Sequence, residues 1–218
     1  MQPTSMPDPY FLIVVLAILS LAPFVVVMVT SFVKLVVVFS LIRNALGIQQ
    51  IPPNMVTNGL AVILSIYIMA PVGQQMLDGL QNVTFEQKDL ASIKTVFETV
   101  KEPLQAFMAK HTSERERQFF FASAKKFWPP EKARGLKQDD LLILIPSFAA
   151  SELTSAFQIG FLLYLPFIAI DLIISNILMA MGMMMVSPMT ISLPFKLLLF
   201  VLLDGWTRLI HGLVLTYC

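Results

Sequence analysis

Cysteine and histidine are the scarcest reactive residues of this sequence. Cys218 is the single cysteine, which excludes an intrachain disulfide and a metal cluster held by several cysteines. The two histidines, His111 and His211, lie far apart and belong to no metal-ligand pattern. We therefore predict that the chain holds no metal ion.

Sequence motifs of the common enzyme classes are also missing. No GxxxxGK[ST], GxGxxG, HExxH or GxSxG pattern occurs, so the usual signatures of nucleotide binding, zinc hydrolysis and serine hydrolysis are absent. The interpretation that follows is a protein that is not an enzyme and that needs no cofactor.

Charged residues are few and nearly balanced. They make up 13% of the sequence, against about 25% in an ordinary soluble domain. Hydrophobic residues make up 56%, and the mean hydropathy is +0.76, which is typical of an integral membrane protein. The 15 basic and 14 acidic residues nearly cancel, and this argues against a nucleic-acid partner.

The charges that are present gather in the middle of the chain. Residues 73–140 hold 21 of the 29 charged residues, between two apolar flanks. We predict an all-α chain in three parts: an apolar helical hairpin over 1–75, a charged helical segment over 76–140, and apolar helices over 141–218. No Lys or Arg precedes the first apolar run, so that run lacks the basic start of a secretory signal and is expected to be retained.

Prolines and glycines mark the predicted helix ends of the first part. Residues 10–42 are long enough to cross a bilayer as one long or bent helix, with Pro23 as the expected kink. Gly47 and the double proline after it predict a stop and a turn. Asn54 is the expected cap of a second apolar helix over about 55–72.

Two further prolines bear on the helices that follow. Pro103 is expected to divide or bend an amphipathic helix of the middle segment, and Pro166 to interrupt an apolar helix of the third part. Between them lies a polar stripe that lipid would not accept, so it should face other helices or water. Its members are Ser147, Ser151, Thr154, Ser155 and Gln158, with Glu152 at its edge.

The segment over 179–206 is apolar but broken in its middle. Six of the 13 methionines lie between residues 179 and 189, and Pro188 and Pro194 interrupt the same region. We predict helix on both sides with irregular backbone between. Such backbone is tolerated at membrane depth only where it is buried in protein or lines a water-filled path, which makes the segment a candidate constriction.

Three ionisable residues of the third part are candidate functional residues: Glu152, Asp171 and Lys196. Each costs about 2.5–3.5 kcal/mol inside an apolar helix, so such groups face a partner or a cavity. We expect Lys196 to be bridged to Glu152 or to Asp171, either within the chain or across a subunit boundary. A structural ion pair and a proton relay both stay open as roles.

Met183, Met184 and Met185 have two interpretations. Methionine is unbranched and adaptable, so a ring of such side chains from several copies would close around passing chains of different shape and still seal against ions. The alternative is a methionine-rich filler of a protein core. Their position at a predicted break favours the seal.

Three long stretches of the flanks carry a resemblance to a known family. They are TSFVKLVVVFSLIRNALGIQQIPPNMV, PSFAASELTSAFQIGFLLYLPF and IDLIISNILMAMGMMMVSPMTISLPFKLLLFVLLDGW. Together they resemble the R subunit of the type III secretion export gate, the SctR/YscR group, whose flagellar relative is FliP. The resemblance covers residues 10–75 and 140–217.

The resemblance implies a function that composition alone does not give. Family members form a pentameric core that joins the small S and T subunits in a closed helical pore and works with other components of the export apparatus. This pore passes unfolded secreted proteins across the bacterial inner membrane, and the assembled gate lies largely on the periplasmic side of the membrane plane. The family's gasket maps onto Met183, Met184 and Met185, and its intersubunit charges map onto Glu152, Asp171 and Lys196.

One other class stays open from the residues themselves. An ion-coupled transporter of small molecules would also use broken helices and buried acids, although no internal repeat of the kind common in that class is visible. The lack of a basic leader fits the injectisome branch of the resemblance better than the flagellar branch.

Overall fold

The computed structural model describes residues 9–48, 51–81 and 90–218, and the expectation about the leader at 1–8 lies outside these ranges. The described residues form helices and their connections, with no strand among them, which confirms the predicted all-α class. The helices are α1 (Pro9–Val29), α2 (Phe32–Ala45), α3 (Asn54–Gln81), α4 (Leu90–His111), α5 (Glu114–Phe127), α6 (Pro130–Ala133), α7 (Leu141–Ala180), α8 (Pro188–Leu202) and α9 (Gly205–Leu215).

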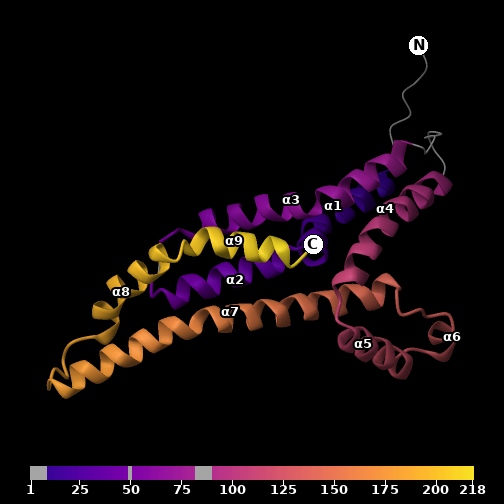
Figure 1. The fold of residues 1–218 in the computed structure, drawn as a ribbon. Helices are drawn as coiled ribbons and strands as arrows, with labels where there is room; N and C mark the ends of the chain where they lie inside the picture. The colour runs from indigo at the N-terminus through magenta and orange to yellow at the C-terminus, as the bar shows by residue number, and fades with distance from the viewer. Residues whose placement is uncertain (1–8, 49–50, 82–89) are drawn as a thin grey trace, which may run out of the picture.

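The helices are organised around α2 and α7. Figure 1 shows α7 as the longest element, with α2 lying along it and with α8 and α9 folding back from its C-terminal end. α3 contacts α2, and α4 and α5 contact the N-terminal part of α7. The charged middle therefore lies at one end of α7, and the methionine-rich connection lies at the other.

The main core follows the buried face of α2. Leu35, Val38, Phe39 and Ile42 lie at positions i, i+3, i+4 and i+7 of the helix and are almost fully buried. Facing them are apolar side chains of the other helices, among them Ala61, Ala156, Phe167, Phe200, Leu209 and Leu213. Small residues let the backbones approach closely, because they leave room for the partner's side chains.

Gly160 is the clearest example of this close approach. A Cβ atom built on it would lie 2.2 Å from Leu41 Cδ1, so a larger residue here would force the Leu41 side chain of α2 to move. A second, smaller core joins the charged middle to the apolar part; it consists of Val29, Met108, Leu144 and Phe148.

A sharp bend follows the first helix, at a place that no proline marks. Pro23 lies inside α1, and the chain bends by 76° at residues 30–31. Ser31 is fully buried there, and its hydroxyl lies 3.1 Å from Ser65 Oγ on α3. The bend directs α2 into the core, so packing of the two flanking helices decides its position.

The prediction that Pro166 interrupts a helix is wrong, because α7 continues through it for 40 residues. Pro103 does not divide α4, which runs through it, and Pro194 lies inside α8. Proline removes one backbone donor from a helix, a loss that packing on both sides can offset. The irregular part of the broken segment is therefore confined to residues 181–187.

The second apolar helix starts where the sequence predicts and ends later. α3 runs to Gln81, beyond the expected end near residue 72. Asn54 Oδ1 accepts a hydrogen bond from Arg43 Nη1, so this side chain joins α3 to α2 rather than acting as the expected cap. The Pro53 carbonyl accepts the hydrogen bond of the Val56 amide at 2.9 Å.

Membrane-spanning capacity is present in the described residues. α3 and α7 are each long and apolar enough to cross a bilayer. Two pairs of consecutive helices would each be long and apolar enough if the pair counted as one span, which gives up to four spans. Residues 23–29 and α2 meet at an angle of 76°, and α8 and α9 meet at an angle of 60°. Only 11% of the most apolar window of α7 is buried, so lipid or other chains must cover the rest.

Candidate functional site

The connection between α7 and α8 is a defined turn that presents methionines. The Gly182 amide donates to the Met179 carbonyl at 3.0 Å, and the Met183 amide donates to the Leu178 carbonyl at 3.0 Å. With Gly182 at a φ of 74°, this is a Schellman motif that ends α7. Pro188 then occupies the first turn of α8, where its missing N–H costs no helical hydrogen bond.

The methionine turn, residues 181–187, leaves its thioethers uncovered. Met183, Met184 and Met185 are 44%, 87% and 101% exposed, so they are not core filler within this chain. Figure 1 shows the turn at the far left end of the molecule, away from the charged middle. Three unbranched apolar side chains at the tip of a helical hairpin form an uncovered apolar surface.

An ion pair lies between the two arms of this hairpin. Lys196 Nζ on α8 lies 2.5 Å from Asp171 Oδ2 on α7, and it also donates to the Ala45 carbonyl at 3.2 Å. The carbonyls at the end of α2 attract a cation, because the helix dipole is negative there. The Ser192 hydroxyl donates to Asp171 Oδ1 at 2.6 Å. These contacts hold α8 against α7 and α2 behind the methionine turn.

A second ion pair lies deeper, toward the other end of α7. Lys34 Nζ is 2.9 Å from Glu152 Oε1, and the two side chains are 5% and 2% exposed. The Tyr217 hydroxyl donates to the other carboxylate oxygen, Glu152 Oε2. Both oxygens of this buried carboxylate are therefore bonded, as a buried charge requires.

The structure brings together only part of the predicted charge set. Lys196 lies against Asp171, one of the two acids considered for it, whereas Glu152 binds Lys34. Both contacts close within one chain, and the intersubunit role of these charges stays a prediction. The sequence did contain a signal for Lys34, which is the only charged residue in residues 10–42. Lys196 was the one cation considered for both Glu152 and Asp171, so one of these two acids was left without a cation. No sequence signal pointed to Tyr217.

The polar stripe of α7 faces two environments. Ser147 is buried, and its hydroxyl donates to the Ile143 carbonyl at 2.6 Å within the helix. The rest of the stripe lines an open polar cavity of about 500 Å³. Its lining consists of Ser151, Glu152, Thr154, Ser155 and Gln158 of α7, with Lys34, Lys110, His111, Thr112, Ser113, Arg115 and Glu116 opposite.

Burial, followed by the charges of Lys110 and Lys34, lowers the pKa of His111 to about 4, so this imidazole is neutral at physiological pH.

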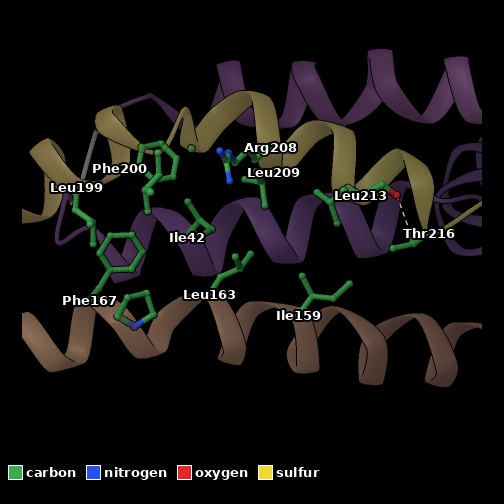
Figure 2. A pocket seen from close by; sticks show the side chains of 14 residues that line it. Ile42, Ile159, Leu163, Phe167, Leu199, Phe200, Arg208, Leu209, Leu213 and Thr216 are labelled. Atoms are coloured by element: carbon green, nitrogen blue, oxygen red, sulfur yellow. Dashed lines mark hydrogen bonds between the residues drawn. The ribbon is translucent and has the colours of Figure 1, made fainter.

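A groove of the opposite character lies between α2, α7, α8 and α9. Figure 2 shows Ile42, Leu163 and Leu209 pointing into it from different helices. Its volume is about 350 Å³, and its lining is apolar except for Arg208 and Thr216. Within the described residues, no group of three His, Cys, Asp or Glu side chains is placed to hold a metal ion.

Known proteins resemble this chain over nearly its whole length. The FliP family matches residues 15–213. "Yop proteins translocation protein R" of Yersinia pestis is 59% identical over 213 residues, which cover 98% of each chain. "Virulence protein YscR" of Salmonella typhimurium is 50% identical over 98% of this chain and 99% of its own. "Hypersensitivity response secretion protein HrcR" of Ralstonia nicotianae is 51% identical over 94% and 96%. The chain therefore belongs to the FliP family.

Proposed function

We propose that this chain is the core pore-forming subunit of a type III secretion export apparatus. In this role it conducts unfolded secreted proteins across the bacterial inner membrane. The observation that carries the proposal is the match of residues 15–213 to the FliP family, together with relatives that are named for translocation and secretion. The match favours this function over an ion-coupled transporter of small molecules.

The uncovered apolar surface supports assembly with further chains. Much of α7 and α8 is apolar and exposed, including Phe157, Phe161, Leu172 and Leu198. A single chain would leave these side chains to lipid alone, whereas a ring would bury many of them between copies. We propose a homo-oligomer, the pentamer that the resemblance implies, with the S and T subunits as its partners.

The methionine turn supports a seal in that ring. Several copies would bring the tips of their hairpins together, and each would contribute Met183, Met184 and Met185. Flexible thioether side chains repack around side chains of different size, so one ring accepts many unfolded sequences. A closed apolar constriction excludes water and therefore ions. The chain would act as a conduit and not as a catalyst.

The length of α7 supports a gate that extends beyond the membrane. Its 40 residues rise by about 60 Å, about twice the thickness of the hydrocarbon core. We propose that the gate is held in the inner membrane and lies largely on its periplasmic side. The polar cavity beside Glu152 would then lie in an aqueous region.

Native mass spectrometry of the complex extracted in detergent tests the assembly. We expect five copies of this chain together with small hydrophobic membrane partners. A monomer alone would contradict the proposal. Export is tested separately, by expressing the chain in a type III secreting bacterium that lacks its own R subunit and measuring the secreted proteins in the culture medium.

A further inference from the structure

Tyr217 is buried although the residues on both sides of it are exposed. It follows the end of α9 and is 8% exposed, whereas Thr216 and Cys218 lie at the surface. Its amide donates to the Val214 carbonyl at 3.1 Å, a turn that directs the ring inward. The chain therefore places one large side chain in the interior just beyond its last helix.

This side chain contacts helices from three distant parts of the sequence. Its hydroxyl donates to Glu152 Oε2 on α7, and its ring centre lies 4.2 Å from Lys34 Nζ on α2. On α4, the ring stacks on Phe107 at 6.1 Å with an interplanar angle of 14°, and it meets His111 edge-on at 5.1 Å. Tyr217 is thus hydrogen-bonded to Glu152, and its ring contacts Lys34 and two aromatic side chains of the charged middle segment.

The chemistry of the ion pair explains why a tyrosine is suited to this position. Lys34 binds one oxygen of Glu152, and the second oxygen needs a donor because a buried carboxylate oxygen without one is strongly disfavoured. A phenol supplies that donor, and the face of its ring attracts the lysine ammonium. Phenylalanine would keep the ring contacts and lose the donor.

We propose that Tyr217 is a positioning residue that anchors α9 to the junction of α2, α4 and α7 by completing the ion pair of Lys34 and Glu152. It thereby fixes the C-terminal helices relative to the charged middle segment. This role goes beyond the proposed export function and does not depend on it, because it concerns how one chain holds its own shape.

A distance measurement within the chain tests the anchor. Cys218 is the only cysteine and is exposed, so one spin label attaches there, and an Ala106→Cys substitution on the exposed side of α4 takes the second. Mixing with an excess of the unlabelled Cys218→Ala chain suppresses distances between copies. We expect one narrow distance distribution by pulsed electron paramagnetic resonance in the otherwise native chain.

Substitutions at Tyr217 should release the labelled residue Cys218 from its fixed distance to α4, and different substitutions should do so to different degrees. Tyr217→Ala should give a broad distribution, because it loses the ring contacts and the hydroxyl. Tyr217→Phe should lower the ratio of anchored to released chains about tenfold, since a hydrogen bond to a charged group is lost. Thr216→Ala is the matched control and should leave the narrow distribution unchanged, because Thr216 is exposed and its hydroxyl bonds only the nearby Leu213 carbonyl.

The Glu152→Gln background separates anchoring from simple packing. There the phenol donates to a neutral amide, a hydrogen bond about half as strong, so changing Tyr217 to Phe should alter the ratio by only about threefold. An equal effect of Tyr217→Phe in both backgrounds would overturn the proposal, because the hydroxyl would then act independently of Glu152. A narrow distribution in Tyr217→Ala would overturn it as well.

Discussion

Replacing Glu152 by glutamine should destabilise the chain by about 3–5 kcal/mol. The carboxylate bonds Lys34 at 2.9 Å and the Tyr217 hydroxyl, and both charged side chains are at most 5% exposed. The substitution keeps the size of the side chain and removes its charge. It therefore leaves the Lys34 ammonium buried beside a neutral group, and this uncompensated charge causes most of the loss.

The expected loss of stability can be measured as a shift of the melting temperature. For a chain of this length, each kcal/mol corresponds to about 2–4 °C in the melting temperature, so the loss is about 6–20 °C. Thermal unfolding of the purified protein in detergent measures it. Glu98→Gln is the matched control: Glu98 pairs with Lys101 at 3.3 Å on the surface, and its loss should cost less than about 1 kcal/mol.

A double substitution tests the reasoning behind this prediction. Lys34→Met with Glu152→Leu removes both charges together, so no buried ion is left without a partner. The double variant should recover most of the stability that either single variant loses, because replacing a buried pair by apolar residues is often neutral or stabilising. If the two single losses simply add, the ion pair does not determine stability here and the explanation is wrong.

Four further predictions concern the rest of the site. Replacing the three exposed methionines of the turn by alanine should change the free energy of unfolding by less than about 0.5 kcal/mol. The same replacement should raise the ion conductance of vesicles that contain the assembled gate, and unchanged conductance would rule out the seal. Gly182→Ala should destabilise the chain by about 1 kcal/mol in thermal unfolding, because the φ of 74° disfavours a Cβ atom. Lys196→Met should cost about 1–3 kcal/mol by the same assay, less than Glu152→Gln, since Asp171 is 35% exposed and water can solvate it. The pKa of His111 is about 4 in the folded chain and 6.5 in the unfolded chain, so its contribution to stability is complete above pH 6.5 and falls as the pH drops toward 4. His111→Phe should therefore flatten the dependence of the free energy of unfolding on pH in this range.

Local sequence patterns predicted the helices well because apolar periodicity is a local property. The turn at residues 181–187 was also predictable, since a glycine that ends a helix and a proline that begins one lie within seven positions. The prediction from proline failed inside one helix. Pro166 lies within the continuous α7, whereas the 76° bend at residues 30–31 contains no proline and places Ser31 against Ser65 of α3.

The partner of Glu152 could not be read from spacing. Lys34 is 118 positions away and Tyr217 is 65 positions away, so only the packing of α2, α7 and the segment after α9 brings them together. Composition nevertheless required some partner, because a buried carboxylate must be bonded. The sequence thus predicted that a cation was needed, and the fold determined which one.

The spacing of the two ion pairs along α7 limits where the chain can lie in a membrane. Glu152 and Asp171 are 19 residues apart on one continuous helix, a rise of about 28 Å. This nearly equals the thickness of the hydrocarbon core, so the two pairs cannot both lie near its centre. Glu152 lies beside the polar cavity and the charged middle segment, which belong in water. If the chain crossed the bilayer alone, Asp171, which is partly exposed, would therefore lie within the hydrocarbon core or at its opposite face, in contact with lipid. A continuous protein wall around that end of α7 is the arrangement that keeps Asp171 and Lys196 away from lipid.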